Sequence, residues 1–264
     1  NFSPFQFRQM RIVEFPAYMN FAQAFPGTVP YSEAAGFIVD IENRGDRVDG
    51  VTYVTAHEIG HQWWAHQVIG ADMQGQTVLS ETLAQYSALM VMEHKYGHAE
   101  IFRFLRGSLG GYLRGRASDV LGEVPLERVE GQAHIRYQKG GLVMYLLKDQ
   151  MGEEAVNRAL RSLIEEYAFQ GPPYPTSRDL ISRLRAEAGP GLQDLITDLF
   201  EKITLYDLKV TAGRATQQAD GKWSVDIDVE AKKFYADELG VETEAPLEGM
   251  FNIGVFTAQP GKPG

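Results

Sequence analysis

Helical periodicity fills the middle of the chain, from Val51 to about residue 203, and strand-like patterns lie on either side of it. In the middle, apolar residues recur three and four positions apart, the spacing of one helix face. Before Val51 the apolar runs are short and broken by proline and glycine, and after Thr204 apolar and polar residues alternate as in strands. This order of patterns indicates an α+β fold.

Individual elements can be predicted from the same patterns. Strands are expected at Arg11–Phe15, Gly36–Ile41, 205–212, 223–230 and 249–257, and a polar turn is expected at Glu42–Gly50. Helices are expected at 51–66, 78–96, 98–114, 136–151, 153–168, 176–188 and 191–201. Because the composition shifts near Thr204, we expect one α+β domain over 1–203 and a small all-β segment over 204–264. Three or four strands are few for an independent sheet, so this segment is expected to pack on its neighbour.

Composition excludes some classes of function. The net charge is −10 and the basic residues are scattered, which argues against a nucleic-acid partner. No apolar run approaches the roughly 20 residues of a membrane span. With no cysteine in the chain, any metal must be held by His, Asp or Glu. The chain begins at Asn1 without a leader, and we expect it to be a piece of something longer.

The most informative motif is His57-Glu58-Ile59-Gly60-His61. Two histidines four positions apart project from one face of a helix, about one turn apart. That spacing suits two ligands of one tetrahedral zinc ion. Glu58 adjoins the first ligand, so its carboxylate can act as general base toward a metal-bound water and then as proton donor to the leaving amine. The motif is therefore typical of a zinc peptidase.

Glu81 is the expected third ligand. It begins an apolar-periodic helix and follows His61 by 20 positions. A carboxylate at a helix start is also favoured by the helix dipole alone. Together with the two histidines, however, it completes a set of three protein ligands, which leaves a fourth position for water as in catalytic zinc sites. We expect one Zn²⁺ per chain, although other divalent ions accept the same ligand types.

This pattern resembles the aminopeptidase N family of gluzincin zinc peptidases, in which HExxH is followed by a Glu near this distance. Tyr31–Ile38 is similar to the family's Gly-Ala-Met-Glu-Asn-x-Gly-Leu-Ile segment, and Glu33 precedes His57 by the family's 24 positions. Tyr137-Gln138-Lys139-Gly140 resembles the family's Tyr-x-Lys-Gly. The resemblance covers roughly residues 10–200.

The resemblance implies roles for two further residues. Glu33 matches the glutamate that binds the free α-amine of the substrate, which a carboxylate can do through charge-assisted hydrogen bonds. Tyr137 matches the tyrosine that donates a hydrogen bond to the oxyanion of the tetrahedral intermediate. The implied activity is zinc-dependent removal of N-terminal residues from peptides.

The resemblance also implies a fold and a setting. A thermolysin-like domain with a small mixed sheet over helices is expected, followed by a β-sandwich-like segment. Phe25–Pro30 and Leu79–Tyr86 are similar to bacterial members fused to transporter permeases. This subgroup implies a longer, membrane-anchored chain whose peptidase part lies on the extracytoplasmic face of a bacterial membrane.

Two other functions stay open. Four of the five residues matching Gly-Ala-Met-Glu-Asn differ, with Pro30, Tyr31, Ser32 and Ala34 in their places. An endopeptidase of the same fold is therefore one alternative. The other is a zinc-bearing peptide-binding or sensor module of a membrane transport assembly, against which the presence of Glu58 argues.

Overall fold

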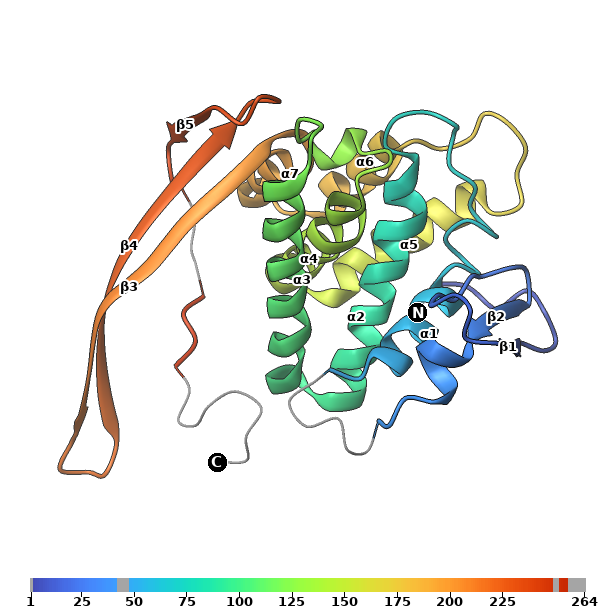
Figure 1. Cartoon of the computed structure of the whole chain (residues 1–264). Helices are drawn as coiled ribbons and strands as arrows, with labels where there is room; N and C mark the ends of the chain where they lie inside the picture. Colours follow the sequence, from blue (N-terminus) through green and yellow to red (C-terminus); the bar gives the residue numbers. More distant parts are fainter. Residues whose placement is uncertain (1, 42–47, 249–251, 256–264) are drawn as a thin grey trace.

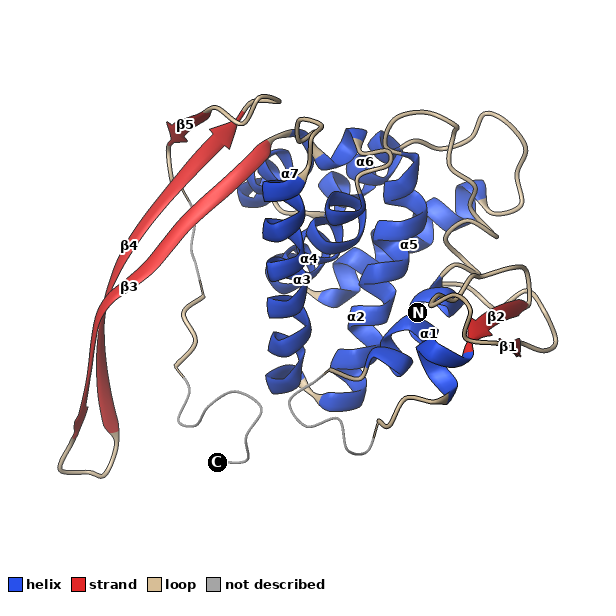
Figure 2. Ribbon diagram, in the orientation of Figure 1, coloured by secondary structure: helices blue, strands red, loops and turns tan. Residues whose placement is uncertain are grey.

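The computed structural model describes residues 2–41, 48–248 and 252–255. Helices form the body, a long β-hairpin stands along one side of it, and a short strand pair lies on the other side (Figures 1 and 2). The helices are α1 (Gly50–Gly60), α2 (Leu83–Tyr96), α3 (His98–Ser118), α4 (Gly140–Met151), α5 (Glu153–Tyr167), α6 (Ser177–Glu187) and α7 (Gln193–Ile196). Short helical turns are η1 (Glu33–Phe37), η2 (Val78–Thr82), η3 (Leu126–Arg128), η4 (His134–Lys139), η5 (Pro190–Leu192) and η6 (Thr197–Glu201). The strands are β1 (Arg11–Phe15), β2 (Thr28–Ser32), β3 (Ile203–Gln217), β4 (Trp223–Ala236) and β5 (Glu242–Ala245).

The N-terminal part forms a small sheet beside α1. β1 and β2 pair in parallel, and Ala22 adds an antiparallel bridge to Tyr31. The strand predicted at Arg11–Phe15 is confirmed, whereas the strand predicted at Gly36–Ile41 is wrong. There the chain turns through η1, because the Ser32 hydroxyl caps the turn by accepting the Ala34 N–H. The turn also folds Gly36 against Tyr31, where a Cβ atom would lie 2.4 Å from the ring.

The helical body follows the predicted periodicity closely. α1 begins at Gly50, directly after Asp49, whose carboxylate accepts the Thr52 N–H as an N-cap. It ends at Gly60, earlier than the predicted residue 66, and the chain continues through turns in which Ala65 has a φ of 109°. The other predicted helices match the observed elements to within a few residues. They bury one core, with Trp64, Tyr86 and Phe200 among its largest members.

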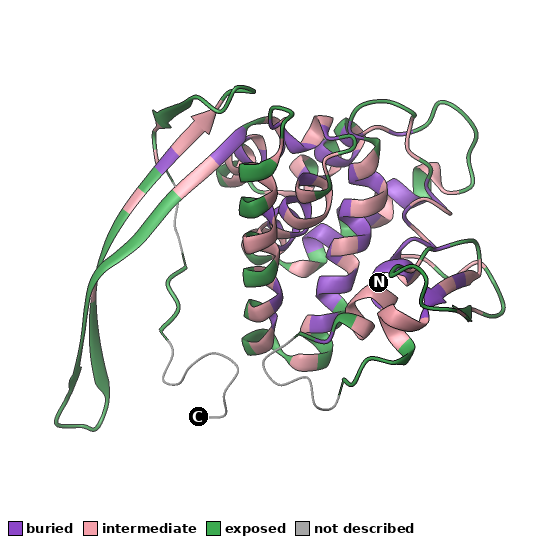
Figure 3. Cartoon of the chain, viewed as in Figure 1, coloured by how far each residue is buried: buried purple, intermediate pink, exposed green. Residues whose placement is uncertain are grey.

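β3, β4 and β5 form one antiparallel sheet in that order. The strands predicted at 205–212 and 223–230 lie within β3 and β4 and are confirmed, whereas β5 was not predicted. The strand predicted at 249–257 is wrong at 252–255, which form none, and its remaining positions lie outside the described residues. Most of the hairpin is exposed (Figure 3).

The sheet is attached to the helical body at its base. The Asp198 carboxylate on η6 accepts hydrogen bonds from Lys233 Nζ at 2.8 Å and from the Tyr235 hydroxyl at 2.6 Å. The Thr204 hydroxyl donates to the backbone carbonyl of Asp198. The all-β character of the tail agrees with expectation, and its separation at residue 203 as a distinct domain stays a prediction. Across the described part of the chain, no helix is both long and apolar enough to cross a bilayer.

Candidate metal centre

His57 and His61 lie on one face of the chain where α1 ends. Their ring centroids are 4.7 Å apart, and the two Nε2 atoms face each other at 3.1 Å. Both side chains are buried. The helical spacing that the sequence predicts for these two residues therefore brings both imidazole nitrogens to one point.

Glu81 joins the two histidines from the neighbouring element η2. Its Oε2 lies 3.2 Å from His57 Nε2 and 3.3 Å from His61 Nε2. Such proximity requires α1 and α2 to cross closely, and Gly60 permits it, since a Cβ there would already lie 3.2 Å from the Ala84 Cα. Among the described residues these three form a group whose ligand atoms lie within 4.8 Å of one another.

The donor set fits a zinc ion. Two imidazole nitrogens and one carboxylate oxygen are zinc ligands, and three protein ligands leave one position open. His61 Nδ1 lies 3.0 Å from the Trp64 carbonyl, a partner that favours a proton on Nδ1 and leaves Nε2 free for a metal. Among the described residues, the polar neighbours of the two facing Nε2 atoms are each other and the Glu81 carboxylate.

The electrostatics of the group agree with this donor set. Burial acts to raise the pKa of Glu81, but its hydrogen bonds to His57 and His61 outweigh burial and hold that pKa well below its ordinary value. Burial acts to lower the pKa of His61, and the bond to Glu81 more than offsets it, so the pKa is raised. Glu81 is therefore an anion ready to serve as a ligand.

Glu58 lies beside the group and is itself buried. Burial raises the pKa of its carboxyl group, against the opposing effect of His57 and His61. The backbone of Ala24, which precedes β2, also acts to lower this pKa. A buried carboxyl group next to two metal-ligand candidates and with a raised pKa suits proton transfer.

Tyr137 reaches the same group from η4. Its ring centroid lies 5.8 Å from that of His57, and its hydroxyl is close enough to Glu81 for that carboxylate to affect its pKa. Burial, with the nearby Glu81 charge, raises the pKa of Tyr137 to about 12. The phenol is therefore protonated at neutral pH and is a hydrogen-bond donor.

Glu33 is placed at the start of η1, directly after β2. Its Oε2 accepts the Ala17 N–H at 3.1 Å. No contact between Glu33 and the three-residue group occurs among the described interactions. Of the predicted site residues, His57, Glu58, His61, Glu81 and Tyr137 thus lie together, and Glu33 makes no described contact with them.

Gln62 is a positioning residue that the sequence did not single out. Its side chain accepts the Gly27 N–H at 2.9 Å and donates to the Phe25 carbonyl at 3.0 Å. It thereby ties the loop that follows Ala24 to the end of α1. The sequence shows only a glutamine directly after His61, and a glutamine at that position does not by itself indicate a role.

Comparison with known proteins agrees with this arrangement. The model of the Peptidase family M1 domain matches residues 2–201. Aminopeptidase M1-B of Oryza sativa subsp. japonica is 26% identical over 205 residues, covering 74% of this chain and 22% of that protein. The Tricorn protease-interacting factor F2 of Thermoplasma volcanium is 22% identical over 252 residues, covering 92% of this chain and 30% of the factor. The chain thus spans less than a third of the length of these relatives.

A solved structure shares the fold. The M1 zinc metallopeptidase from Deinococcus radiodurans aligns with a TM-score of 0.55 at 21% identity, covering 75% of this chain and 40% of that one. The thermolysin-like architecture expected from the motifs is therefore confirmed at the level of the fold.

Proposed function

Because the chain belongs to peptidase family M1, we propose that it carries the catalytic site of a zinc-dependent aminopeptidase. The observation that supports this most is the convergence of His57, His61 and Glu81 within 4.8 Å, with Glu58 buried beside them. Its substrate is a peptide, and the finer proposal is a peptide with a free N-terminus.

The residues divide the chemistry among them. His57, His61 and Glu81 would hold the ion, which when bound polarises the peptide carbonyl and lowers the pKa of a water molecule. Glu58 accepts a proton from the attacking water and returns it to the leaving amine, roles for which its raised pKa is suited. Tyr137, protonated at neutral pH, donates a hydrogen bond to the oxyanion as it forms.

Glu33 is proposed to bind the substrate's α-amine. What supports this role is its match to the family's amine-binding glutamate and its position at the end of β2, the strand whose Tyr31 lies near Glu58. A carboxylate there would select cationic N-termini by charge-assisted hydrogen bonding.

The test uses zinc-loaded protein with matched free and N-acetylated peptides. We expect cleavage of the free peptides only, and loss of turnover by about 100- to 10,000-fold in Glu58→Gln, the range that general acid–base groups contribute. Zinc content measured by atomic absorption should be unchanged in this variant, since Glu58 is not a proposed ligand. Turnover retained in Glu58→Gln would remove Glu58 from its role.

The endopeptidase alternative has one observation in its favour. Among the described interactions, Glu33 is hydrogen-bonded to Ala17 and makes none with the three-residue group. Cleavage of acetylated peptides within the chain, at rates equal to those of free peptides, would establish it. Binding of peptides without any cleavage over long incubation would instead support a binding or sensor module.

A link to a membrane transporter is also a proposal. It rests on the similarity of Phe25–Pro30 and Leu79–Tyr86 to bacterial members fused to permeases. Such a link would make the chain one part of a longer membrane-anchored protein.

A further inference from the structure

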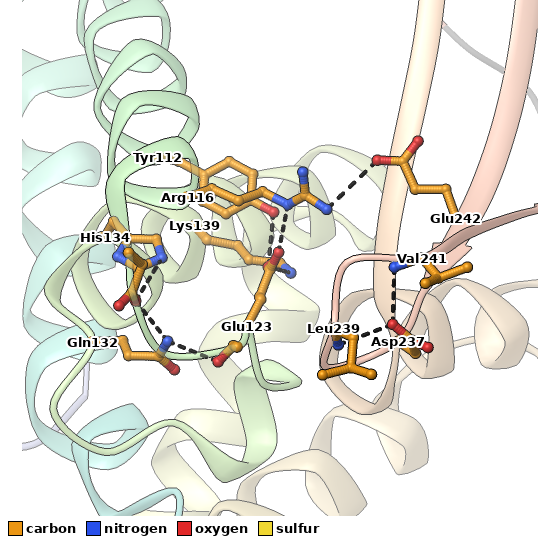
Figure 4. Close-up of polar contacts among 12 residues, drawn as sticks. Tyr112, Arg116, Glu123, Gln132, His134, Lys139, Asp237, Leu239, Val241 and Glu242 are labelled. Atoms are coloured by element: carbon orange, nitrogen blue, oxygen red, sulfur yellow. Dashed lines mark hydrogen bonds and ion pairs between the residues drawn. The ribbon is translucent and has the colours of Figure 1, made fainter.

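A second buried polar cluster lies behind η4, away from the three-residue group. We call Tyr112, Arg116, Glu123 and Lys139 the Glu123 cluster. Glu123 Oε1 accepts from Lys139 Nζ at 2.7 Å and from the Tyr112 hydroxyl at 2.8 Å, and its Oε2 accepts from Arg116 Nε at 2.8 Å. Figure 4 shows these side chains converging from α3, the loop after it, and η4.

Lys139 is the member that connects this cluster to the proposed active site. It is the third residue of the Tyr-x-Lys-Gly segment, two positions after Tyr137, and only 7% of it is exposed. A lysine this deeply buried is strongly unfavourable unless its charge is paired. Glu123 supplies the opposite charge. The position of Glu123 therefore determines where the Lys139 ammonium group lies, and with it this part of η4.

The rest of η4 has further polar contacts, and one of them is made by Thr82. The Thr82 hydroxyl, next to Glu81, donates to the Arg136 carbonyl at 2.6 Å. Gly140 packs on the same threonine, since a Cβ there would lie 2.4 Å from Thr82 Oγ1. This tether fixes the face of η4 that lies toward the three-residue group.

The opposite flank of η4 packs against Gly111 and Gly115 of α3, where a Cβ would lie 2.9 Å from the Gln138 Cγ and 2.3 Å from the His134 Cβ. A cavity of about 750 Å³ lies there, and His134 and Gln138 of η4 line it together with residues of α3 and the following loop. Besides this packing, two charged contacts join η4 to the loop after α3. They are His134 Nε2–Asp119 Oδ2 at 3.7 Å and Lys139 Nζ–Glu123 Oε1 at 2.7 Å, and the Lys139–Glu123 pair is the shorter of the two.

We propose that Lys139 is a positioning residue for Tyr137: paired with Glu123, it holds η4 so that the Tyr137 ring stays beside His57. The proposal rests on the role given to Tyr137 under the proposed function. The structural part of the proposal is that the Lys139–Glu123 pair fixes the position of η4. This part can be tested without measuring turnover.

α4 offers a matched control. Lys148 is mostly buried, pairs with Glu93 at 2.6 Å, and lies over the ring of Tyr145, whose hydroxyl also donates to Glu93. Lys139 likewise lies over the ring of Tyr112. The two lysines therefore have the same chemistry, but Lys148 lies nine positions beyond Lys139 and outside η4.

The first measurement is amide hydrogen exchange of a peptide spanning 134–139. In Lys139→Met we expect exchange there to accelerate by at least about tenfold, with α5 unchanged, whereas Lys148→Met should leave 134–139 as in the wild type. Unchanged exchange at 134–139 in Lys139→Met would overturn the proposal, as would equal acceleration in Lys148→Met. If Lys139→Met does not fold, Glu123→Gln removes the same charge pair and is read by the same criteria.

The second measurement is a double-mutant cycle on kcat and KM with an amino-acid anilide substrate. We expect Lys139→Met to lower kcat about 10- to 100-fold with KM changed less than about threefold, and to add no loss in a Tyr137→Phe background. A multiplicative further loss there would show that Lys139 does not act through Tyr137. If Tyr137→Phe keeps full kcat, the role of Tyr137 fails, and hydrogen exchange still decides whether Lys139 positions η4.

Discussion

At the scale of single residues, His57, His61 and Glu81 bring three ligand atoms together at one buried point. Two imidazole nitrogens facing each other at 3.1 Å are a poor arrangement unless they share a proton or a metal. A ligand that binds only the folded chain stabilises it by mass action. Metal binding should therefore be visible in the stability of the protein as well as in its activity.

We expect zinc to raise the melting temperature. A free concentration of 100 times Kd stabilises by about 2.7 kcal/mol, or roughly 5–10 °C for a chain of this size. Differential scanning calorimetry with zinc and with a chelator measures the shift, and His61→Ala should abolish it. Equal melting temperatures with and without zinc in the wild type would contradict a three-ligand site.

Asp49 is a second residue whose surroundings make a prediction. It caps α1 through the Thr52 N–H and also accepts from Lys95 Nζ at 3.2 Å and the Tyr96 hydroxyl at 2.5 Å. Burial acts to raise the pKa of Asp49, but these hydrogen bonds outweigh it and hold the pKa well below its ordinary value of 3.8. Because the folded state binds fewer protons than the unfolded state, Asp49 stabilises the fold above about pH 4, and this contribution is lost as the pH falls further.

Asp49→Ala should lower the free energy of unfolding by about 2 kcal/mol at neutral pH, through loss of the cap and the buried hydrogen bonds. The difference from wild type should shrink as the pH falls below 4. Urea titrations at several pH values measure it. A difference that stays constant down to pH 2 would show that the Asp49 charge has no part in the effect.

At the scale of elements, α3 carries glycines with opposite surroundings. Gly107 is exposed with open space around it, whereas a Cβ on Gly115 would lie 2.3 Å from the His134 Cβ. Gly111 faces Gln138 in the same way, at 2.9 Å from its Cγ. Glycine on this helix is thus required only where η4 packs against it.

Gly107→Ala should stabilise the chain by about 0.5–1 kcal/mol, because alanine loses less backbone entropy in a helix interior. Gly115→Ala should destabilise it by about 1–3 kcal/mol, because the new methyl group overpacks the contact with His134. Thermal or urea unfolding of the two variants compares them on one helix. Stabilisation by Gly115→Ala would mean that η4 can move away from α3 without cost.

The elements also show how far sequence reasoning reaches. Long helices were predicted closely, because ten or more periodic residues outweigh local exceptions. β2 was missed because it is five residues long and contains Pro30, and the apolar run 36–41 was read as a strand although Ser32 caps a turn before it. Local patterns of this length carry little information about pairing.

The same contrast between local and distant patterns holds for the site. The spacing of His57, Glu58, His61 and Glu81 predicts that they lie together, because two of the proposed ligands share one helix and the third follows closely in the sequence. The cluster partner of Lys139 could not be predicted in this way, since Glu123 sits in a loop with no motif around it. The bonds of Gln62 to the Gly27 N–H and the Phe25 carbonyl are made to the backbone of the loop that follows Ala24 and leave no side-chain signature there in the sequence.

At the scale of the whole molecule, the tail depends on buried charge where it joins the helical body. Lys233 is 7% exposed and pairs with Asp198, which has the same degree of burial within a few percent. Removing one partner of such a pair leaves the other charge buried and alone.

Asp198→Ala should therefore destabilise the chain by about 3–5 kcal/mol and accelerate hydrogen exchange at 231–236. Asp228 lies at an exposed position of β4, five residues before Lys233. Asp228→Ala should change the free energy of unfolding by less than about 0.5 kcal/mol. The two variants compare loss of one carboxylate at the base of the sheet with loss of one on its exposed part. Equal effects would show that the Asp198 pair does not attach the tail.

The tail also touches the loop that carries Glu123. Arg128 pairs with Glu238 at 3.3 Å, Arg116 lies 3.6 Å from Glu242, and a Cβ on Gly122 would lie 2.0 Å from the Glu238 carbonyl oxygen. Glu238 follows Arg128 by 110 residues, so a ribosome completes the whole helical body before this contact can form. Contacts across so long a loop are slow to close. The outer charges around Glu123 can thus pair only after the helical body has been synthesised.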